Sequence, residues 1–203
     1  QRDADIIHSP IDLERFVPAS SHGEHFLVVS RLEHWKRVDY AVAAFNVLGL
    51  PLRIIGTGKE EARLKAMAKP NITFLGSVDD ATLAQEYREA RAVVFTPLLE
   101  YGLIPLEANA SGTPVICLGQ GGIIETMIPW RDDAASNGKA TAIFFQEQSV
   151  ADLVDAVRRF QDVSFDSTFL VKHASQWGVP VFKEKLQRLV MESSSGWLGH
   201  NAS

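Results

Sequence analysis

The chain has 203 residues, of which 46% are hydrophobic and 22% are charged, as in an ordinary soluble globular domain. Its 20 basic and 25 acidic residues give a net charge of −5, so bulk attraction to nucleic acid is not expected. One cysteine, Cys117, excludes an intrachain disulfide and a cysteine-rich zinc site. No apolar run approaches the roughly 20 residues that span a bilayer, and residues 1–10 show no signal-peptide pattern, so we expect a cytoplasmic chain.

Short apolar runs alternate with longer segments of helical period from Phe26 onward. The runs start at residues 26, 52, 72, 92, 114 and 142, and the helical segments between them include 38–48, 59–68 and 81–91. Most runs are too continuous for strands with one wet face, and parallel strands covered on both faces have this pattern. The sequence therefore predicts an α/β fold, a Rossmann-like parallel sheet of about six strands with helices on both faces.

Three helices are expected after the last strand. Ser149 is a suitable N-cap for the first, whose apolar residues recur at helical spacing over 150–160. The other two are expected around 165–177 and 180–192. The apolar stripe of the first helix predicts packing against the sheet.

The same pattern predicts one domain. Residues 1–25 are interpreted as a segment that connects domains and leads into the first strand, and residues 26–192 as the domain itself. The small residues Ser193 to Gly196 predict a loose tail over residues 193–203.

The loop after the first predicted strand is basic. In an open parallel sheet, ligands bind beyond the carboxyl ends of the strands, so the loops that leave the strands carry the chemistry. Arg31, Lys36 and Arg37 lie within seven residues of one another here. Arg31 and Lys36 could together hold a diphosphate, one through its guanidinium fork and the other as a point charge. The alternative is a solvated turn in which these cations only favour solubility.

Two further loops are rich in glycine. Gly56 and Gly58 follow the second strand, but Glu61 stands where a dinucleotide fingerprint requires a third glycine, so a nicotinamide site is not supported. These glycines predict a tight turn with backbone amides that face a ligand. Gly121 and Gly122 follow the fifth strand and allow close approach of the backbone to a sugar or phosphate, or form a simple flexible turn.

The loop after the fourth strand leads into a helix that Pro105 can start. Gly102 precedes this helix, so the free N–H groups of Leu103 and Ile104 would face an anion there. We place Glu107 in the first turn, where the helix dipole favours a carboxylate without any ligand. The functional alternative is that Glu107 accepts the two vicinal hydroxyls of a ribose.

Together these motifs resemble the donor-binding half of a retaining glycosyltransferase of the GT-B fold, family 4. The motifs are Arg31-x-x-x-x-Lys36, Gly56-Thr57-Gly58, Phe74-Leu75-Gly76, Glu100-Tyr101-Gly102-Leu103-Ile104-Pro105-Leu106-Glu107-Ala108 and Gly121-Gly122-Ile123-Ile124-Glu125-Thr126. Within that family the chain is most similar to bacterial mannosyltransferases of polysaccharide and O-antigen assembly. That similarity is carried by Arg37-Val38-Asp39, by Ile143-Phe144-Phe145-x-x-Gln148-Ser149 and by the opening Pro10-Ile11-Asp12-Leu13-Glu14-Arg15-Phe16.

The resemblance implies a nucleotide-sugar donor, with GDP-mannose favoured and a UDP-sugar as the alternative, and no required cofactor or metal. It implies that Arg31 and Lys36 bind the diphosphate, that Glu107 binds the ribose, and that the backbone near Val78 lies beside the base. Leu103 and Ile104 would present amides to the phosphate. The acceptor would be a saccharide or a lipid-linked saccharide, held by an amino-terminal domain. In a full-length enzyme this implies a cytoplasmic location, with peripheral contact at the inner face of a membrane.

One departure from the family pattern concerns a pair of glutamates eight positions apart. Counting back from Glu107 gives Leu99, and Glu100 stands one residue late. Either Glu100 contacts the donor sugar, as a catalytic residue with Arg31 and Lys36, or the chain is a non-catalytic nucleotide-binding or regulatory module. GT-B enzymes are about twice this length, so we expect the isolated chain to bind nucleoside diphosphate without transferring sugar.

Overall fold

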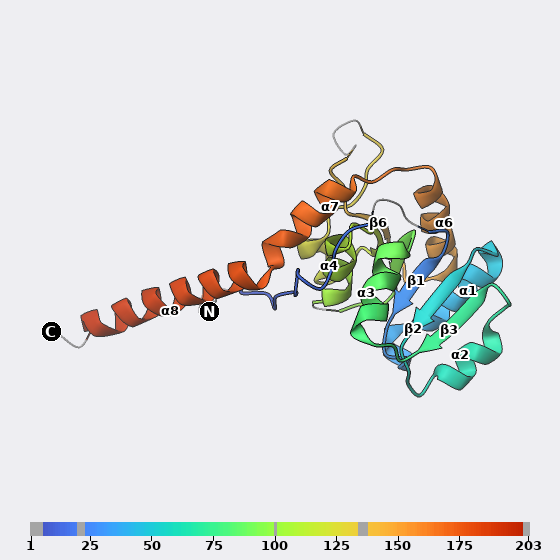
Figure 1. Ribbon diagram of the computed structural model, residues 1–203, viewed down its shortest axis with the longest axis horizontal. Helices are drawn as coiled ribbons and strands as arrows, with labels where there is room; N and C mark the ends of the chain where they lie inside the picture. The colour runs from blue at the N-terminus through green and yellow to red at the C-terminus, as the bar shows by residue number, and fades with distance from the viewer. Residues whose placement is uncertain (1–5, 20–22, 100, 134–137, 201–203) are drawn as a thin grey trace.

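The computed structural model describes residues 6–19, 23–99, 101–133 and 138–200, and the side chains among them up to residue 192. Its centre is a six-stranded parallel sheet with the strand order β3-β2-β1-β4-β5-β6 (Figure 1). The strands are β1 (Phe26–Val29), β2 (Leu52–Ile55), β3 (Ile72–Gly76), β4 (Ala92–Phe95), β5 (Val115–Leu118) and β6 (Ala142–Phe145). The predicted fold class is confirmed, and each strand begins within one residue of its predicted start.

Helices connect the strands and follow the last one. They are the 3-10 helix η1 (His34–Lys36), α1 (Val38–Leu48), α2 (Glu61–Met67), α3 (Asp80–Glu89), α4 (Leu103–Ala110), α5 (Ile123–Thr126), α6 (Val150–Gln161), α7 (Ser167–Ala174), the 3-10 helix η2 (Ser175–Trp177) and α8 (Val179–His200). Two of their starts follow from local capping. The Asp79 side chain accepts a hydrogen bond from the Thr82 N–H, and the predicted cap Ser149 accepts one from the Asp152 N–H.

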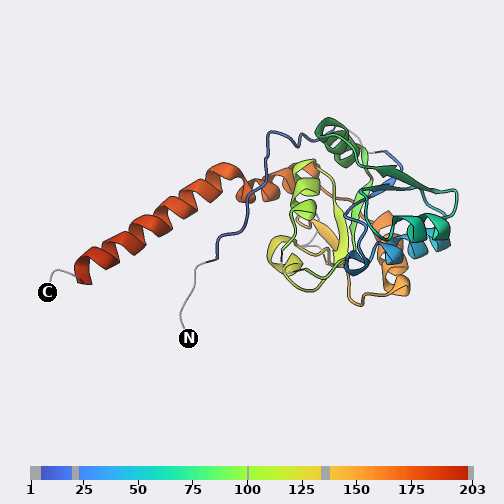
Figure 2. The same ribbon diagram turned by 90° about the horizontal axis from the view of Figure 1, so that it is seen from below.

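The helices cover both faces of the sheet, as Figure 2 shows with the sheet seen edge-on. One core forms where α1, α2 and α6 pack on the sheet, around Phe26, Phe45 and Phe160, whose rings meet edge to face. The other core lies under α3, α4, α5 and α7 and includes the fully buried Tyr87. Because side chains alternate between the faces of a strand, each strand contributes to both cores, which explains the continuous apolar runs.

The segment before β1 packs against the second core. The Ile11 N–H donates to the Trp177 carbonyl at 2.9 Å, and Ile11 forms an isolated parallel bridge with Gly178. The Phe16 ring meets the Tyr87 ring edge to face, with centroids 5.6 Å apart. Ile11 and Phe16 therefore fix this segment to the domain, one beside η2 and the other against α3.

The carboxyl-terminal end differs from the prediction. Ser193 to Gly196 do not begin a loose tail, because α8 continues as one helix to His200 and extends away from the sheet (Figures 1 and 2). After Pro180 in its first turn, α8 contains no proline, and the exposed Arg188 and Glu192 form a pair one turn apart at 3.9 Å. Extending an existing helix by a residue requires little free energy, and a single glycine destabilises it by only about 1 kcal/mol. The small residues therefore do not end the helix.

Candidate functional site

The order of the strands reverses between β1 and β4, since β1 leads to β2 on one side while β4 leads to β5 on the other. Such a reversal opens a crevice at the carboxyl ends of the two strands. A cavity of about 150 Å³ lies there. Its lining includes Ser30, Arg31, Lys36, Thr96, Pro97 and Ile104, with the last residues of β1 and β4. The structure therefore brings together Arg31 and Lys36 from the loop after β1 and Ile104 from the helix after β4, all three of which the sequence indicated as site residues.

Two cations meet at one side of this cavity. The Lys36 Nζ lies 4.0 Å from the centroid of the Trp35 ring, and the Arg31 Cζ lies 5.8 Å from it, while Trp35 itself is 48% exposed. Burial lowers the pKa of the Lys36 ammonium, and the charge of Arg31 lowers it further. Two like charges repel each other, and an anion bound between them offsets this repulsion. This part of the cavity therefore favours a negatively charged ligand.

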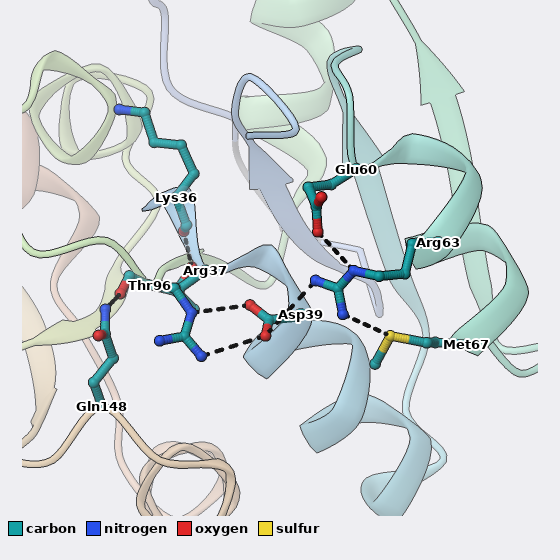
Figure 3. Close-up of polar contacts among 8 residues, drawn as sticks. All are labelled: Lys36, Arg37, Asp39, Glu60, Arg63, Met67, Thr96 and Gln148. Atoms are coloured by element: carbon teal, nitrogen blue, oxygen red, sulfur yellow. Dashed lines mark hydrogen bonds and ion pairs between the residues drawn. The ribbon is translucent and has the colours of Figure 1, made fainter. Parts of the chain in front are cut away.

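The backbone at Lys36 is held by residues that the sequence alone did not single out. The Thr96 hydroxyl donates to the Lys36 carbonyl at 2.9 Å, and the Gln148 amide donates to the Thr96 carbonyl at 3.0 Å (Figure 3). Gln148 lies in a stretch that the family resemblance quotes, whereas nothing in the sequence marks Thr96.

Arg37, next to Lys36, adopts a left-handed conformation with φ of 54°, which no other described residue except glycine shares. Its guanidinium contacts both carboxylate oxygens of Asp39, at 3.2 and 3.3 Å (Figure 3). It also stacks over the Tyr40 ring, with its Cζ 3.8 Å from the centroid. Left-handed backbone costs about 1–2 kcal/mol for a residue with a Cβ. These side-chain contacts offset that strain directly after Lys36.

Gly56 and Gly58 allow two loops to pack closely together. A Cβ on Gly56 would lie 1.8 Å from the Ser30 carbonyl oxygen, and one on Gly58 would lie 2.4 Å from the Leu32 carbonyl oxygen. The Gly56 N–H donates to the Gly76 carbonyl at 2.7 Å, so that amide does not face a ligand. The two glycines let the loop after β2 press against the loop that carries Arg31.

The amino terminus of α4 faces the same edge of the sheet. Gly102 is the N-cap residue and provides no side-chain cap, and Leu103 and Ile104 are the first two helical residues. The amides of the first turn have no partner within the helix, so those of Leu103 and Ile104 are suited to an anion at the cavity. Pro105 is the third residue of the helix rather than its first.

We had placed Glu107 in the first turn of α4, but it lies beyond that turn. It is therefore outside the range in which the helix dipole acts strongly. Its Oε2 accepts a hydrogen bond of 2.8 Å from the hydroxyl of Tyr87 on α3. Burial raises the pKa of the Glu107 carboxyl, and the Tyr87 hydrogen bond and the charge of Arg15 act in the opposite direction. One carboxylate oxygen is therefore held by the fold, and Glu107 is not among the residues that line the cavity.

The loop with Gly121 and Gly122 is bound to the loop after β4. The Gly122 N–H donates to the Leu99 carbonyl at 2.9 Å, so this amide is not available to a sugar or phosphate. Gly121 has φ of 70°, and a Cβ there would lie 2.5 Å from the same carbonyl oxygen. Leu99 thus contributes its backbone to the site. Glu100, the proposed sugar contact, lies outside the described residues.

Val78 follows β3 at the same edge of the sheet, partly buried against the second core, and it does not line the cavity. Within the described part of the chain, no group of three or more His, Cys, Asp or Glu side chains is arranged to hold a metal ion. A membrane-spanning helix, which would have to be long and apolar, is also not found there.

A doubly wound parallel sheet with two cations and a helix amino terminus at its switch point defines an α/β domain of the nucleotide-binding type. Residues 11–167 match the family described as glycosyl transferases, group 1. The chain belongs to this family.

Individual relatives agree with this assignment. The glycogen synthase of Mycobacterium tuberculosis (strain H37Rv) is 31% identical over 172 residues, which are 77% of this chain and 39% of that protein. An uncharacterized glycosyltransferase of Methanocaldococcus jannaschii, MJ1607, is 30% identical over 125 residues, 57% of this chain and 32% of that protein. The chain thus spans only a part of the curated relatives that it matches.

Solved structures show the same fold. HepE of Anabaena, crystallised in complex with UDP and glucose, superposes with a TM-score of 0.74 at 16% identity and covers 92% of this chain and 56% of that one. Such neighbours confirm that this chain has the architecture of one Rossmann-like half of a GT-B glycosyltransferase.

Proposed function

We propose that the chain binds a nucleotide-sugar donor at the carboxyl ends of β1 and β4, as the donor half of a retaining family 4 glycosyltransferase. The observation that carries the proposal is the convergence of Arg31, Lys36 and the amino terminus of α4 on one cavity at the switch point of the sheet. A diphosphate has the charge and the acceptor oxygens that this set of donors suits.

The same groups suit the chemistry. When the sugar leaves, negative charge builds on the oxygens of the departing nucleoside diphosphate. Two cations and a helix amino terminus that are already in place stabilise that charge. This role requires no metal ion from the chain.

GDP-mannose is our proposed donor, because the stretches at Arg37-Val38-Asp39 and Gln148-Ser149 are similar to those of bacterial mannosyltransferases. A UDP-sugar is the alternative, and the complex of HepE with UDP favours it. The acceptor would be a saccharide or lipid-linked saccharide on the cytoplasmic side of a membrane, positioned by a second domain.

Titration of GDP, UDP, guanosine and uridine against the chain tests this proposal. We expect one of the two diphosphates to bind at least tenfold more tightly than its nucleoside, because the cavity recognises phosphate oxygens. Equal binding of diphosphate and nucleoside, or no binding of either diphosphate, would refute a donor site.

A non-catalytic nucleotide-binding module is the second candidate function, because Leu99 stands where the family has a carboxylate. Glu100→Ala separates the two candidates. If Glu100 contacts the donor sugar, the variant binds GDP-mannose more weakly than the parent chain and binds GDP equally well. Unchanged or parallel affinities for both ligands would favour the non-catalytic module.

A further inference from the structure

We propose that Thr96 and Gln148 are positioning residues that hold Lys36 in place for the diphosphate, a role that rests on the donor site proposed above. They form a chain of two hydrogen bonds, from the Gln148 Nε2 to the Thr96 carbonyl at 3.0 Å and from the Thr96 Oγ1 to the Lys36 carbonyl at 2.9 Å. These two hydrogen bonds connect the loop after β6 with the end of β4, and the end of β4 with the loop after β1 (Figure 3).

The hydrogen bond from the Thr96 hydroxyl fixes the backbone from which the Lys36 side chain starts. Thr96 directly follows β4 and is only 2% exposed, so its hydroxyl is costly to leave without a partner. The Lys36 N–H donates to the Glu33 carbonyl at 2.9 Å, and its carbonyl accepts from Thr96. Both backbone polar groups of Lys36 are therefore engaged, and the flexible part of the residue is its side chain alone.

The hydrogen bond from the Gln148 amide links this arrangement to the loop between β6 and α6. Gln148 directly precedes the N-cap Ser149, whose hydroxyl accepts from the Asp152 N–H at 3.1 Å. The Asp152 carboxylate in turn accepts from the Glu147 N–H at 2.8 Å. Because the segment around Gln148 is held in this way, its side chain reaches Thr96 from a fixed position.

Gln148 acts through Thr96 and Lys36 rather than on a ligand. It does not line the cavity, whereas Thr96 and Lys36 do, and its amide donates to a backbone carbonyl. A cation whose backbone is already ordered loses less conformational entropy when it binds a phosphate. The two side chains would therefore strengthen diphosphate binding without touching the diphosphate.

The test uses Thr96→Val, which keeps the shape of the side chain and removes the hydroxyl, with Thr96→Ser as the matched control. The ligands are the tighter-binding of GDP and UDP and its nucleoside, and thermal unfolding verifies the fold of each variant. We expect Thr96→Val to raise the Kd of the diphosphate about three- to tenfold, the usual effect of one lost hydrogen bond, and Thr96→Ser to stay within about twofold. Gln148→Met should raise the Kd of the diphosphate about two- to fivefold, because Gln148 acts on Lys36 only through Thr96.

A double-mutant cycle separates positioning from a general structural role. In the Lys36→Ala background, Thr96→Val and Gln148→Met should have no further effect on diphosphate binding, because the side chain that they position is gone. Nucleoside binding should not change in any variant. The positioning role is wrong if these substitutions raise the Kd of the diphosphate by the same factors in the Lys36→Ala background. It is also wrong if Thr96→Ser binds the diphosphate as weakly as Thr96→Val.

The same data distinguish a failure of this inference from a failure of the donor site. If the parent chain binds neither diphosphate, the donor site itself is wrong, and the role of Lys36 fails with it. If the parent chain binds and Lys36→Ala weakens binding, while Gln148→Met and Thr96→Val are without effect, only the positioning role is overturned. Should Thr96→Val fail to fold, the Gln148→Met cycle decides the question alone.

Discussion

The hydroxyl of Tyr87 on α3 donates a hydrogen bond of 2.8 Å to the Glu107 carboxylate on α4. Tyr87 is fully buried, so its ring and hydroxyl have a fixed place in the second core. The contact therefore fixes one oxygen of a partly buried acid, the residue that the family resemblance assigns to the ribose of the donor. Two predictions concern this pair.

Glu107→Gln tests the proposed contact with ribose. The amide keeps an oxygen that can accept from Tyr87, so we expect the fold to persist, whereas the charged acceptor for the hydroxyls is lost. The affinity for the ribonucleoside diphosphate should fall by about 1.5–3 kcal/mol, and the preference over the 2′-deoxy analogue should nearly vanish. Calorimetric titration of both ligands measures this, and an unchanged preference would leave Glu107 with only its structural contact to Tyr87.

Tyr87→Phe tests the effect of the hydrogen bond on stability. Burial raises the folded-state pKa of Glu107 above its ordinary value of 4.5, so the folded chain holds this proton more tightly than the unfolded chain. The contribution of Glu107 to stability therefore declines as pH rises from about 4.5 through the folded pKa. Because Tyr87 stabilises the ionised form, its loss should cost about 1–3 kcal/mol near pH 7 and less near pH 4.

Denaturant unfolding at several pH values measures this difference, with Tyr101→Phe as the matched control. The Tyr101 hydroxyl donates to the Ser9 carbonyl at 2.8 Å, an acceptor that does not titrate. The loss in the control should be the same at each pH in that range. A Tyr87→Phe loss that is equally flat would mean that its hydroxyl does not act on the Glu107 charge.

The sequence predicted the elements more completely than the contacts of the site. The β-branched runs and the turns between them are local signals, and they located all six strands and the loop that carries both Arg31 and Lys36. The bond between Tyr87 and Glu107 joins residues on two helices and depends on how α3 and α4 pack together. No local pattern reports such a contact.

The same reason applies to the packing partners of the glycines and to Thr96, which no local pattern marks. Gly121 and Gly58 suit a close approach of the backbone, which the sequence indicates, but the approaching group is a carbonyl of another loop, that of Leu99 or Leu32. The role of Thr96 depends on the reversal of strand order that brings β4 beside β1. The identity of a partner across the sheet is a property of the topology.

Arg31→Ala and Lys36→Ala test the cation pair. Each variant should weaken diphosphate binding by about 1.5–3 kcal/mol and leave nucleoside binding unchanged. Lys183→Ala on α8 removes the same charge far from the cavity, and we expect it to bind like the parent chain. Titration with the diphosphate and the nucleoside measures the difference. Equal losses for both ligands would indicate unfolding, and no loss would show that the loop is only a solvated turn.

Arg37→Gly and Arg37→Ala test the strain beside Lys36. Both variants lose the contacts with Asp39 and Tyr40, but only glycine adopts φ of 54° without cost. Arg37→Gly should therefore be more stable than Arg37→Ala by about 1–2 kcal/mol in denaturant unfolding. Gly49→Ala, at φ of 70° with open space around the added Cβ, should lose a similar amount relative to the parent chain. If the two Arg37 variants are equally stable, the left-handed conformation is not retained without the Arg37 side chain.

The most direct test of the donor site is a crystal structure of the chain with the tighter-binding of GDP and UDP. We expect the diphosphate in the cavity between β1 and β4, within hydrogen-bonding distance of the Arg31 guanidinium, the Lys36 ammonium and the amides of Leu103 and Ile104. We also expect the ribose hydroxyls beside the Glu107 oxygen that Tyr87 does not hold. A diphosphate bound elsewhere on the chain, or bound in this cavity without contact to either cation, would contradict the proposed donor site.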